Sequence, residues 1–345
     1  MMTLPTSHSD DICDVPGVLV GHDTQLDAGT GCTVLLFEHP ALGAVDVRGG
    51  APATRETDLL DPRCMMREVH AVVLAGGSAY GLDAASGVMR YLEERGAGFD
   101  TGVARVPIVP AAALFDLALG RADIRPDAAA GRRAAEAAQS GPVAQGSVGA
   151  GTGATVGKMA GPLYVTKSGL GSASLALPVG SIVVGALAAV NAVGDVYDEA
   201  TGQLLAGARR PDGNGWLNAS GSASTGATQA PGASDARLFP GAQTTLAVVA
   251  TNAACSKADL AKIAGMAHDG LARAIRPVHT PFDGDIVFAL STADGPEAGQ
   301  PASPMMVGML GAAGATALAR AVVNAVRAAT SLHGIPALRD LPLTM

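Results

Sequence analysis

Lysine, aromatic side chains and charge are all scarce in this chain of 345 residues. Charged residues make up 16% and aromatic residues 3%, and the formal net charge is −8. A negative chain repels nucleic acid, and few aromatic rings leave little surface on which bases can stack, so no nucleic-acid partner is expected. Apolar residues reach 48%, which excludes a disordered chain. The chain has nineteen arginines but only four lysines, which are Lys158, Lys167, Lys257 and Lys262.

The sequence also lacks the patterns that mark secreted, membrane and zinc proteins. Residues 1–11 show no basic end followed by an apolar run, so no secretory signal is predicted. The longest apolar stretch, 181–193, is too short to span a bilayer, and no membrane partner is expected. Without a CxxC pair the cysteines are interpreted as reduced thiols of a cytoplasmic protein, with no zinc site or disulfide framework. They are Cys13, Cys32, Cys64 and Cys255.

Strands and helices come in groups along the chain rather than in strict alternation. Apolar runs between turn residues predict strands over 15–21, 32–37, 44–48, 69–74, 181–193, 244–253 and 286–290. Helical spacing of apolar residues predicts helices over 82–95 and 127–140, one from Ser256 that Pro277 ends, and one over 305–331. This grouping favours a layered α+β fold over a simple parallel sheet. Residues 205–242 predict a long loop, of a kind that is often functional.

Two glycine-rich motifs come close to known catalytic loops without matching them. In Gly149–Met159, Thr152 stands where a phosphate-binding loop needs glycine and Met159 where it needs Ser or Thr, so nucleotide binding is not predicted. A glycine-rich strand is the simpler interpretation, and Lys158 within it is a candidate for a buried catalytic-site lysine. In Gly76–Tyr80, the tyrosine replaces the second glycine of a nucleophile elbow, which favours a strand-to-helix turn.

Two further features carry weak signals for a metal or an acid–base site. Asp283-Gly284-Asp285 offers two carboxylates, but the other ligands of a calcium loop are missing, and a plain turn explains it as well. We expect no metal and no cofactor. His268 and His279 are isolated histidines near a predicted helix, and we assign them no catalytic role.

Thr244 is a stronger catalytic candidate than the residues of these motifs because of its position in the chain. A small-residue turn leads directly into an apolar strand, and the threonine stands at the junction, in Gly241-Ala242-Gln243-Thr244-Thr245-Leu246. It can be an ordinary strand residue. If the Gln243–Thr244 bond is cut, however, Thr244 gains a free α-amine with a pKa of about 7.7–8.0, which can act as base for its own hydroxyl. One residue then supplies nucleophile and base, and no histidine is needed.

Five segments spread over roughly 11–335 together form a specific pattern: residues 44–50, 74–82, 189–195, 243–252 and 276–285. In these segments the chain resembles the family of L-aminopeptidase/D-esterases, β-peptidyl aminopeptidases and nylon-oligomer endohydrolases. The resemblance implies a four-layer αββα sandwich similar to the N-terminal-nucleophile hydrolases but with different connectivity. It also implies one hydrolase domain, 1–345, that cuts itself into 1–243 and 244–345 and assembles as a homo-oligomer of the processed pairs.

Carried over residue by residue, the resemblance assigns roles to the motif positions. Thr244 matches the nucleophile, and Asp283 and Asp285 match the pair that orients it in nylon-oligomer hydrolases. Lys158 matches the neighbouring lysine, and Asn191 the side-chain amide that stabilises the oxyanion.

Two positions differ from the family pattern. Gln243 precedes the cleavage point, where threonine-type members often have asparagine. Phe115 stands at a position of the substrate pocket where the family has tyrosine, and it has no hydroxyl.

The leading hypothesis is an autoprocessing threonine hydrolase that cleaves amide bonds in small peptides or oligoamides. Two alternatives stay open: an acyltransferase of the ornithine acetyltransferase type, and a non-processing binding or scaffold protein with the same fold. The sequence does not choose among peptides, β-peptides, D-amino-acid amides or esters, and aminohexanoate oligomers as substrates.

Overall fold

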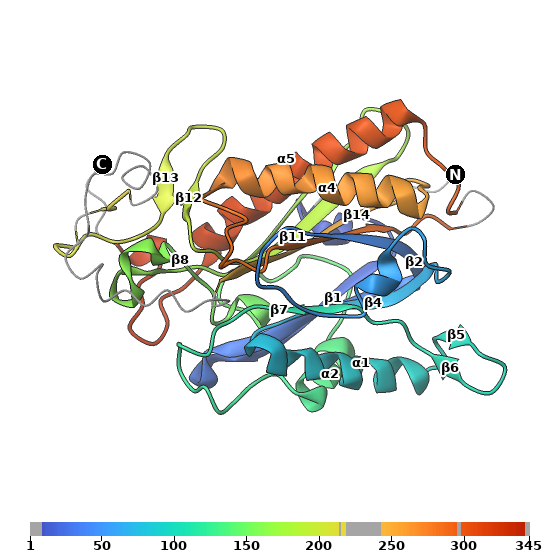
Figure 1. The fold of residues 1–345 in the computed structure, drawn as a ribbon, viewed down its shortest axis with the longest axis horizontal. Helices are drawn as coiled ribbons and strands as arrows, with labels where there is room; N and C mark the ends of the chain where they lie inside the picture. The colour runs from blue at the N-terminus through green and yellow to red at the C-terminus, as the bar shows by residue number, and fades with distance from the viewer. Residues whose placement is uncertain (1–8, 214, 219–242, 295–297, 342–345) are drawn as a thin grey trace.

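The described chain forms four layers, with two helices on each outer face and β-sheet between them (Figure 1). The computed structural model describes residues 9–213, 215–218, 243–294 and 298–341. Helices α4 (Lys257–Ala274) and α5 (Pro304–Ala328) cover one face, and α1 (Ala84–Glu93) and α2 (Ala128–Glu136) cover the other. The predicted α+β fold with an αββα sandwich is confirmed.

A single nine-stranded sheet provides both inner layers because strand β2 (Thr30–Val47) bends and takes part in each. Its first part pairs with β4 over Cys32–Leu36, and its last part pairs with β16 over Leu42–Val47. The register against β4 shifts between the two parts, which is how a strand passes from one layer to the next.

The strands follow the order β10 (Leu170–Ala176), β11 (Val183–Asn191), β14 (Thr244–Thr251), β16 (Ile286–Ser291), β2, β4 (Glu68–Ala75), β7 (Ala111–Ala113) and β3 (Ala53–Arg55), with β1 (Val18–Gln25) beside β2. Smaller sheets pair β5 (Phe99–Asp100) with β6 (Arg105–Val106), β8 (Thr155–Val156) with β9 (Thr166–Lys167), and β12 (Asp195–Tyr197) with β13 (Leu204–Ala206) and β15 (Ile275–Arg276). Strands β11 and β14 run antiparallel, whereas β14 and β16 run parallel, so the starts of β14 and β16 meet the end of β11.

Alternating strand side chains fill separate apolar cores on the two faces of each layer. In β14, Leu246 and Val248 lie in the core between the sheet layers, whereas Ala247 and Val249 lie in the core under α4 and α5. Phe288 of β16 belongs to the inner core and is fully buried. Each such large side chain stabilises the fold by about 1.5–3 kcal/mol. Strand β14 is therefore fixed between two cores, which holds its first residue in place.

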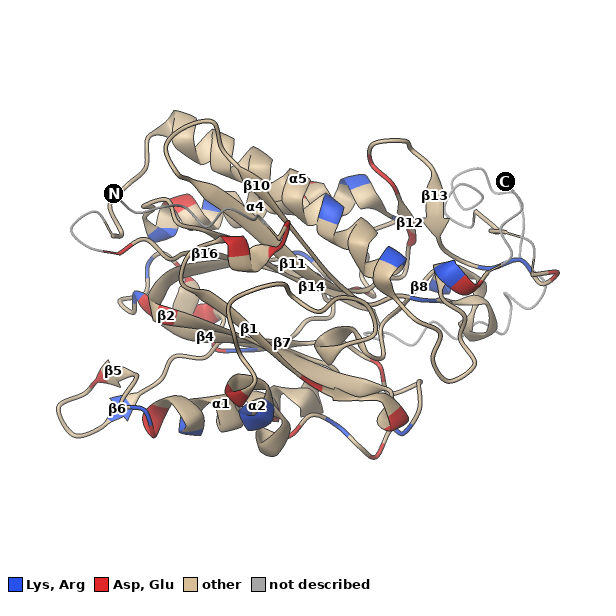
Figure 2. Cartoon of the chain, turned by 180° about the vertical axis from the view of Figure 1, so that it is seen from behind, with Lys and Arg blue, Asp and Glu red and all other residues tan. Residues whose placement is uncertain are grey.

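Local sequence explains where the two long helices begin. Ser256 and Asp259 form the predicted capping box of α4, and Ser303 caps α5 ahead of Pro304 at the first helical position. Among the described residues, α5 is long and apolar enough to cross a membrane by length and composition, but it packs against α4, β10 and β11 as a core helix. Charged residues gather on the outer helices and loops, while the strands carry few (Figure 2).

The structure differs from the sequence-based expectations in several places. The strands predicted over 32–37 and 44–48 are parts of the one strand β2. The tract from Gly149 is not a strand but two 3₁₀ turns around the short β8, because Gly149 and Gly157 adopt positive φ. Strand β10 was not predicted, since its small residues hide the alternation. The loop predicted over 205–242 begins too early, because its first two residues belong to β13, and its residues 214 and 219–242 lie outside the described residues.

Candidate active site

Thr244 is the first residue of β14, and it lies directly opposite Asn191, the last residue of β11. The antiparallel register puts both side chains on the same face, the one that Leu246 and Ala189 turn toward the inner core. Thr244 is 2% exposed and Asn191 1%. The sheet thus brings a hydroxyl and an amide together at the edge of the core, although more than fifty residues separate them in the chain.

Two donors converge on the peptide carbonyl that precedes Thr244. The Thr244 hydroxyl donates to the Gln243 carbonyl oxygen at 2.5 Å, and the Gly284 backbone N–H donates to the same oxygen at 2.8 Å. The Gln243 side chain is buried as well, and its Oε1 has no hydrogen-bond partner among the described residues. A hydroxyl and an N–H on one carbonyl are the parts that acyl transfer requires.

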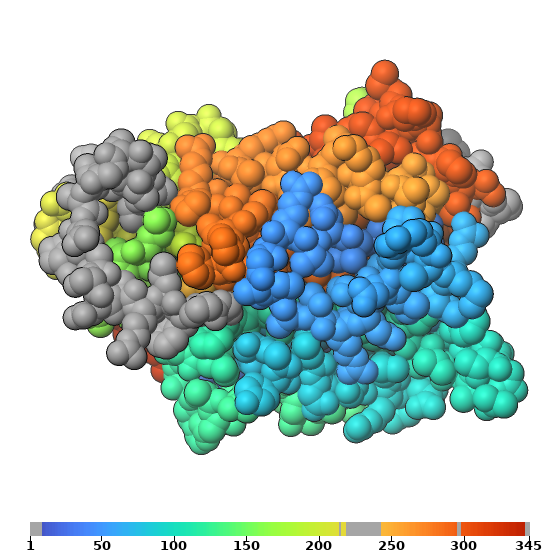
Figure 3. All heavy atoms as spheres, in the orientation of Figure 1, coloured from blue at the N-terminus to red at the C-terminus, as the bar shows by residue number. Residues whose placement is uncertain are grey.

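The turn Asp283–Asp285 approaches Thr244 so closely that its central residue has to be glycine. A Cβ on Gly284 would lie 2.7 Å from the Thr244 Oγ1. On its other side the turn is bonded to the segment after β2: the N–H groups of Arg48 and Gly49 donate to the Asp285 carbonyl, and that of Ala51 to the Asp283 carbonyl. In Figure 3 the chain near residue 50, in blue, lies beside orange atoms of the chain between α4 and β16, while the turn itself is buried.

The two aspartates differ in their partners. The Asp283 carboxylate accepts the Thr280 N–H (2.9 Å) and hydroxyl (2.6 Å), and burial together with the negative charge of Asp285 raises its pKa. The Asp285 carboxylate accepts the Thr245 N–H at 2.7 Å with one oxygen and contacts His279 with the other. Within the described ranges, no group of three or more His, Cys, Asp or Glu side chains is arranged to hold a metal ion.

Lys158 and Asn191 form a polar pair behind the nucleophile. The Lys158 ammonium donates to the Asn191 Oδ1 at 2.7 Å and to its backbone carbonyl at 3.0 Å. Asn191 in turn donates through Nδ2 to the Phe115 carbonyl at 3.0 Å. Burial lowers the pKa of Lys158 to about 7, against the opposing effect of Asp283, Asp116 and Asp285.

All the predicted site residues therefore lie in one place, but Phe115 contributes in an unexpected way. The contact that the structure gives it is made by its backbone carbonyl, which fixes the Asn191 amide, so the missing hydroxyl does not affect this contact. Its side chain is half-buried. The roles of the nucleophile, the carboxylates and the oxyanion donor remain predictions.

Asp116 is a buried carboxylate that the sequence analysis missed, and it explains the motif at Gly76–Tyr80. It accepts the Thr30 hydroxyl and the Gly77 N–H, both at 2.7 Å, and burial raises its pKa to about 6. A Cβ on Gly76 would lie only 2.0 Å from this carboxylate. The motif is therefore a backbone cradle for Asp116. The only sequence signal for Asp116 was a single aspartate in an apolar run, and exposed loops show the same pattern.

His279 was assigned no catalytic role, and Thr280 and Gly284 were given no role of their own, for a related reason. Their partners are Asp285, Asp283 and Gln243, and these contacts are made within or across turns whose geometry the sequence does not give.

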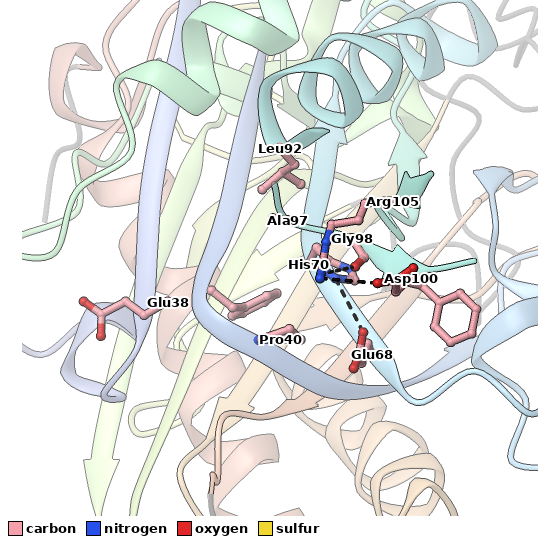
Figure 4. Close-up of a pocket in the computed structure, with 11 residues that line it drawn as sticks. Glu38, Pro40, Glu68, His70, Leu92, Ala97, Gly98, Asp100 and Arg105 are labelled. Atoms are coloured by element: carbon pink, nitrogen blue, oxygen red, sulfur yellow. Dashed lines mark hydrogen bonds and ion pairs between the residues drawn. The ribbon is translucent and has the colours of Figure 1, made fainter. Parts of the chain in front are cut away.

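A separate pocket of about 430 Å³ lies where β2 bends around the start of β4 (Figure 4). Its buried His70 accepts the Ile108 N–H with one ring nitrogen and faces Glu68 at 3.7 Å with the other. Burial lowers the pKa of His70. None of the predicted site residues lines this pocket. Asp116 lies at the opposite end of β4, where Ala75 leads into Gly76.

Comparisons with known sequences relate the whole chain to peptidases and amide hydrolases. Residues 10–338 match peptidase family S58. An uncharacterised aminopeptidase of Mycobacterium tuberculosis is 48% identical over 347 residues, which cover 96% of this chain and 97% of that protein. A 6-aminohexanoate-oligomer endohydrolase of a Kocuria species is 33% identical over 285 residues, which cover 81% of this chain and 74% of that protein.

Solved structures show the same fold at low sequence identity. The L-aminopeptidase D-Ala-esterase/amidase of Ochrobactrum anthropi, described as a variant of the Ntn hydrolase fold, aligns with a TM-score of 0.70 at 21% identity, covering 97% of this chain and 91% of its own. A Burkholderia β-aminopeptidase aligns with a TM-score of 0.67 at 23% identity, covering 98% and 92%. The predicted similarity to N-terminal-nucleophile hydrolases is therefore confirmed for the fold.

Proposed function

Because the chain belongs to peptidase family S58, we propose that it hydrolyses amide bonds with Thr244, after cutting its own chain between Gln243 and Thr244. The observation that carries the proposal is the Gln243 carbonyl, with the Thr244 hydroxyl at 2.5 Å and the Gly284 N–H at 2.8 Å from its oxygen. The attacking atom and a donor for the developing negative charge thus meet at one peptide bond.

The proposed self-cleavage is an acyl shift from nitrogen to oxygen. The Thr244 Oγ1 attacks the Gln243 carbonyl carbon, and the electron pair of the C=O bond moves to the oxygen that faces the Gly284 N–H. Collapse breaks the bond to the Thr244 nitrogen, which receives the proton that the hydroxyl lost. Water then hydrolyses the ester, which leaves a carboxyl group on Gln243 and a free hydroxyl and α-amine on Thr244.

The intact chain needs a separate base, because the Thr244 nitrogen is then an amide. We assign this role to Lys158, whose ammonium group binds Asn191 directly opposite Thr244. With a pKa of about 7, a substantial fraction of this amine is neutral at neutral pH and able to take the hydroxyl proton and pass it to the leaving nitrogen.

Hydrolysis of other molecules follows self-cleavage. In the intact chain Thr244 and Gln243 are each 2% exposed, so a substrate reaches the hydroxyl only after Gln243 has moved away. The new α-amine, with an ordinary pKa of about 7.7–8.0, then serves as the base. The Asn191 amide and the Gly284 N–H stabilise the oxyanion of the acyl-enzyme reaction.

The substrate class follows from the relatives. One is named an uncharacterised aminopeptidase and another a 6-aminohexanoate-oligomer endohydrolase, and both names denote hydrolysis of amide bonds. We propose short peptides and linear oligoamides as substrates of this chain.

Intact-mass measurement of the purified protein tests the proposal. We expect two fragments, 1–243 and 244–345, from the wild-type chain, and one full-length species from Thr244→Ala. Only the cleaved protein should hydrolyse a panel of dipeptide amides and aminohexanoate oligomers. A wild-type chain that stays intact, or a Thr244→Ala chain with undiminished hydrolysis, contradicts the proposal.

A further inference from the structure

His279 lies directly on one of the two site carboxylates. Its backbone N–H (3.0 Å) and its ring Nδ1 (2.9 Å) both contact the Oδ2 of Asp285, while the other oxygen accepts the Thr245 N–H. Asp285 is 1% exposed, and a carboxylate buried to that degree is stable only with such donors. His279 thus supplies two of the three hydrogen bonds that the described residues give to this carboxylate.

We propose that His279 is a positioning residue whose ring fixes the Asp285 carboxylate, and through it the turn that holds the Gly284 N–H on the Gln243 carbonyl. This inference rests on the proposed self-cleavage. On one side the turn is bonded to Arg48 and Gly49, and on the other to Thr245 of β14. The His279 ring adds a further attachment through the Asp285 Oδ2, and without the ring this oxygen keeps only the His279 backbone N–H.

The surroundings of the ring fix its orientation. A carboxylate only accepts, so the ring proton is assigned to Nδ1, and Nε2 has no partner among the described residues. The His268 ring packs edge-on against His279, with the ring centroids 4.7 Å apart and the planes at 78°. His268 is itself bonded through Nε2 to the Asp46 carbonyl at 3.0 Å. The packing keeps the His279 ring within reach of Asp285.

The backbone at His279 allows a matched pair of variants. Its φ of 56° lies in the left-handed region, where Asn, Asp and His are the more common residues besides glycine. His279→Asn places an N–H donor close to the position of Nδ1. His279→Asp has the same size and the same backbone tolerance, but it turns a negative acceptor toward Asp285. The two variants therefore differ in the hydrogen bond and the charge, and hardly in shape.

The rate of self-cleavage, followed by intact mass after synthesis, tests the proposal. We expect His279→Asn to cleave within about tenfold of wild type, and His279→Asp to cleave about a hundredfold more slowly, because a misplaced reacting group costs about that much. His333→Asn and His333→Asp are the controls: this residue has a φ of 49°, and its ring contacts the Leu26 carbonyl instead of the site. Both controls should cleave at the wild-type rate.

Equal cleavage rates for the two His279 variants in folded protein overturn the inference, whereas a wild-type chain that never cleaves overturns the proposed function instead. If His279→Asp does not fold, His279→Gly replaces it, since glycine adopts this backbone without strain. The His279 side chain is 17% exposed, so a small molecule can enter its place. Imidazole, which has an N–H, should restore self-cleavage, and N-methylimidazole, which has none, should not. Rescue by both or by neither overturns the inference.

Discussion

Replacing Gly284 by alanine perturbs the closest contact of the site. The added Cβ would lie 2.7 Å from the Thr244 Oγ1, 2.8 Å from the Ala51 carbonyl oxygen and 3.1 Å from the Pro52 Cα. Ordinary contact with a Cβ begins at 3.4 Å, so the hydroxyl or the turn must shift by more than half an ångström. Two of the three neighbours are backbone atoms, which cannot rotate away. The contact with the Ala51 carbonyl oxygen is relieved only by a shift of the backbone, so both the Thr244 hydroxyl and the turn that carries the Gly284 N–H are displaced.

The expected result is slower self-cleavage in a folded protein. Since a displacement of about 1 Å can reduce the rate of a positioned reaction by about a hundredfold, we expect Gly284→Ala to cleave about ten- to a hundredfold more slowly than wild type. This corresponds to about 1.4–2.7 kcal/mol of barrier. The fraction of full-length chain is followed by denaturing gel and intact mass at fixed temperature and pH.

Gly308→Ala is the matched control, because an alanine there, on helix α5, meets nothing within 4 Å. It should cleave at the wild-type rate and gain up to about 1 kcal/mol of helix stability. If folded Gly284→Ala also cleaves at the wild-type rate, the hydroxyl is not confined between the turn and the Gln243 carbonyl. The assignment of Thr244 and Gly284 is then wrong.

Three further outcomes follow from the site and the core. The rate of self-cleavage should rise with pH and level off above about pH 7, because protonated Lys158 cannot accept a proton. Lys158→Arg, which stays charged, should cleave itself about a hundredfold or more slowly than wild type, and a flat rate between about pH 5 and pH 9 speaks against this base. Asn191→Ala removes an oxyanion donor, so kcat of the cleaved protein should fall by about 10²–10³ on an amide substrate, and an unchanged kcat excludes that role. Phe288→Ala, made in the Thr244→Ala protein, opens a cavity in the inner core and should lower the free energy of unfolding in urea by about 3–5 kcal/mol. A loss below about 1 kcal/mol contradicts the shared core between the sheet layers.

Most of the fold could be predicted because its signals are local. The apolar run after Thr244 gave β14, and the capping box at Ser256 gave the start of α4. The continuity of β2 could not be predicted, because its bend passes through the exposed, polar Glu38–Pro40, which interrupts the apolar pattern. Hydrogen bonding to a neighbouring strand, not side-chain burial, decides that such a segment is part of a strand.

The candidate site could be predicted only where a resemblance supplied the partners. Lys158 and Asn191 had no local signal that linked them, and the structure joins them at 2.7 Å. Asp116 had neither a motif nor a resemblance, and His279 lies within the resembling segment 276–285 but was assigned no catalytic role. The single domain, the oligomer and the cytoplasmic location remain predictions.

By itself the sequence determined which residues have the chemistry: a threonine at the mouth of an apolar strand, a pair of aspartates around a glycine, and a lysine among glycines. Those properties belong to single residues and short patterns, and composition and spacing are enough to find them. Only the tertiary structure decided that the Gly284 N–H and the Thr244 hydroxyl face the same carbonyl oxygen, and that a histidine lies behind Asp285. The physical reason is that these contacts join β14 to the turn before β16, and their distances are set by how the strands pair and by the cores on either side.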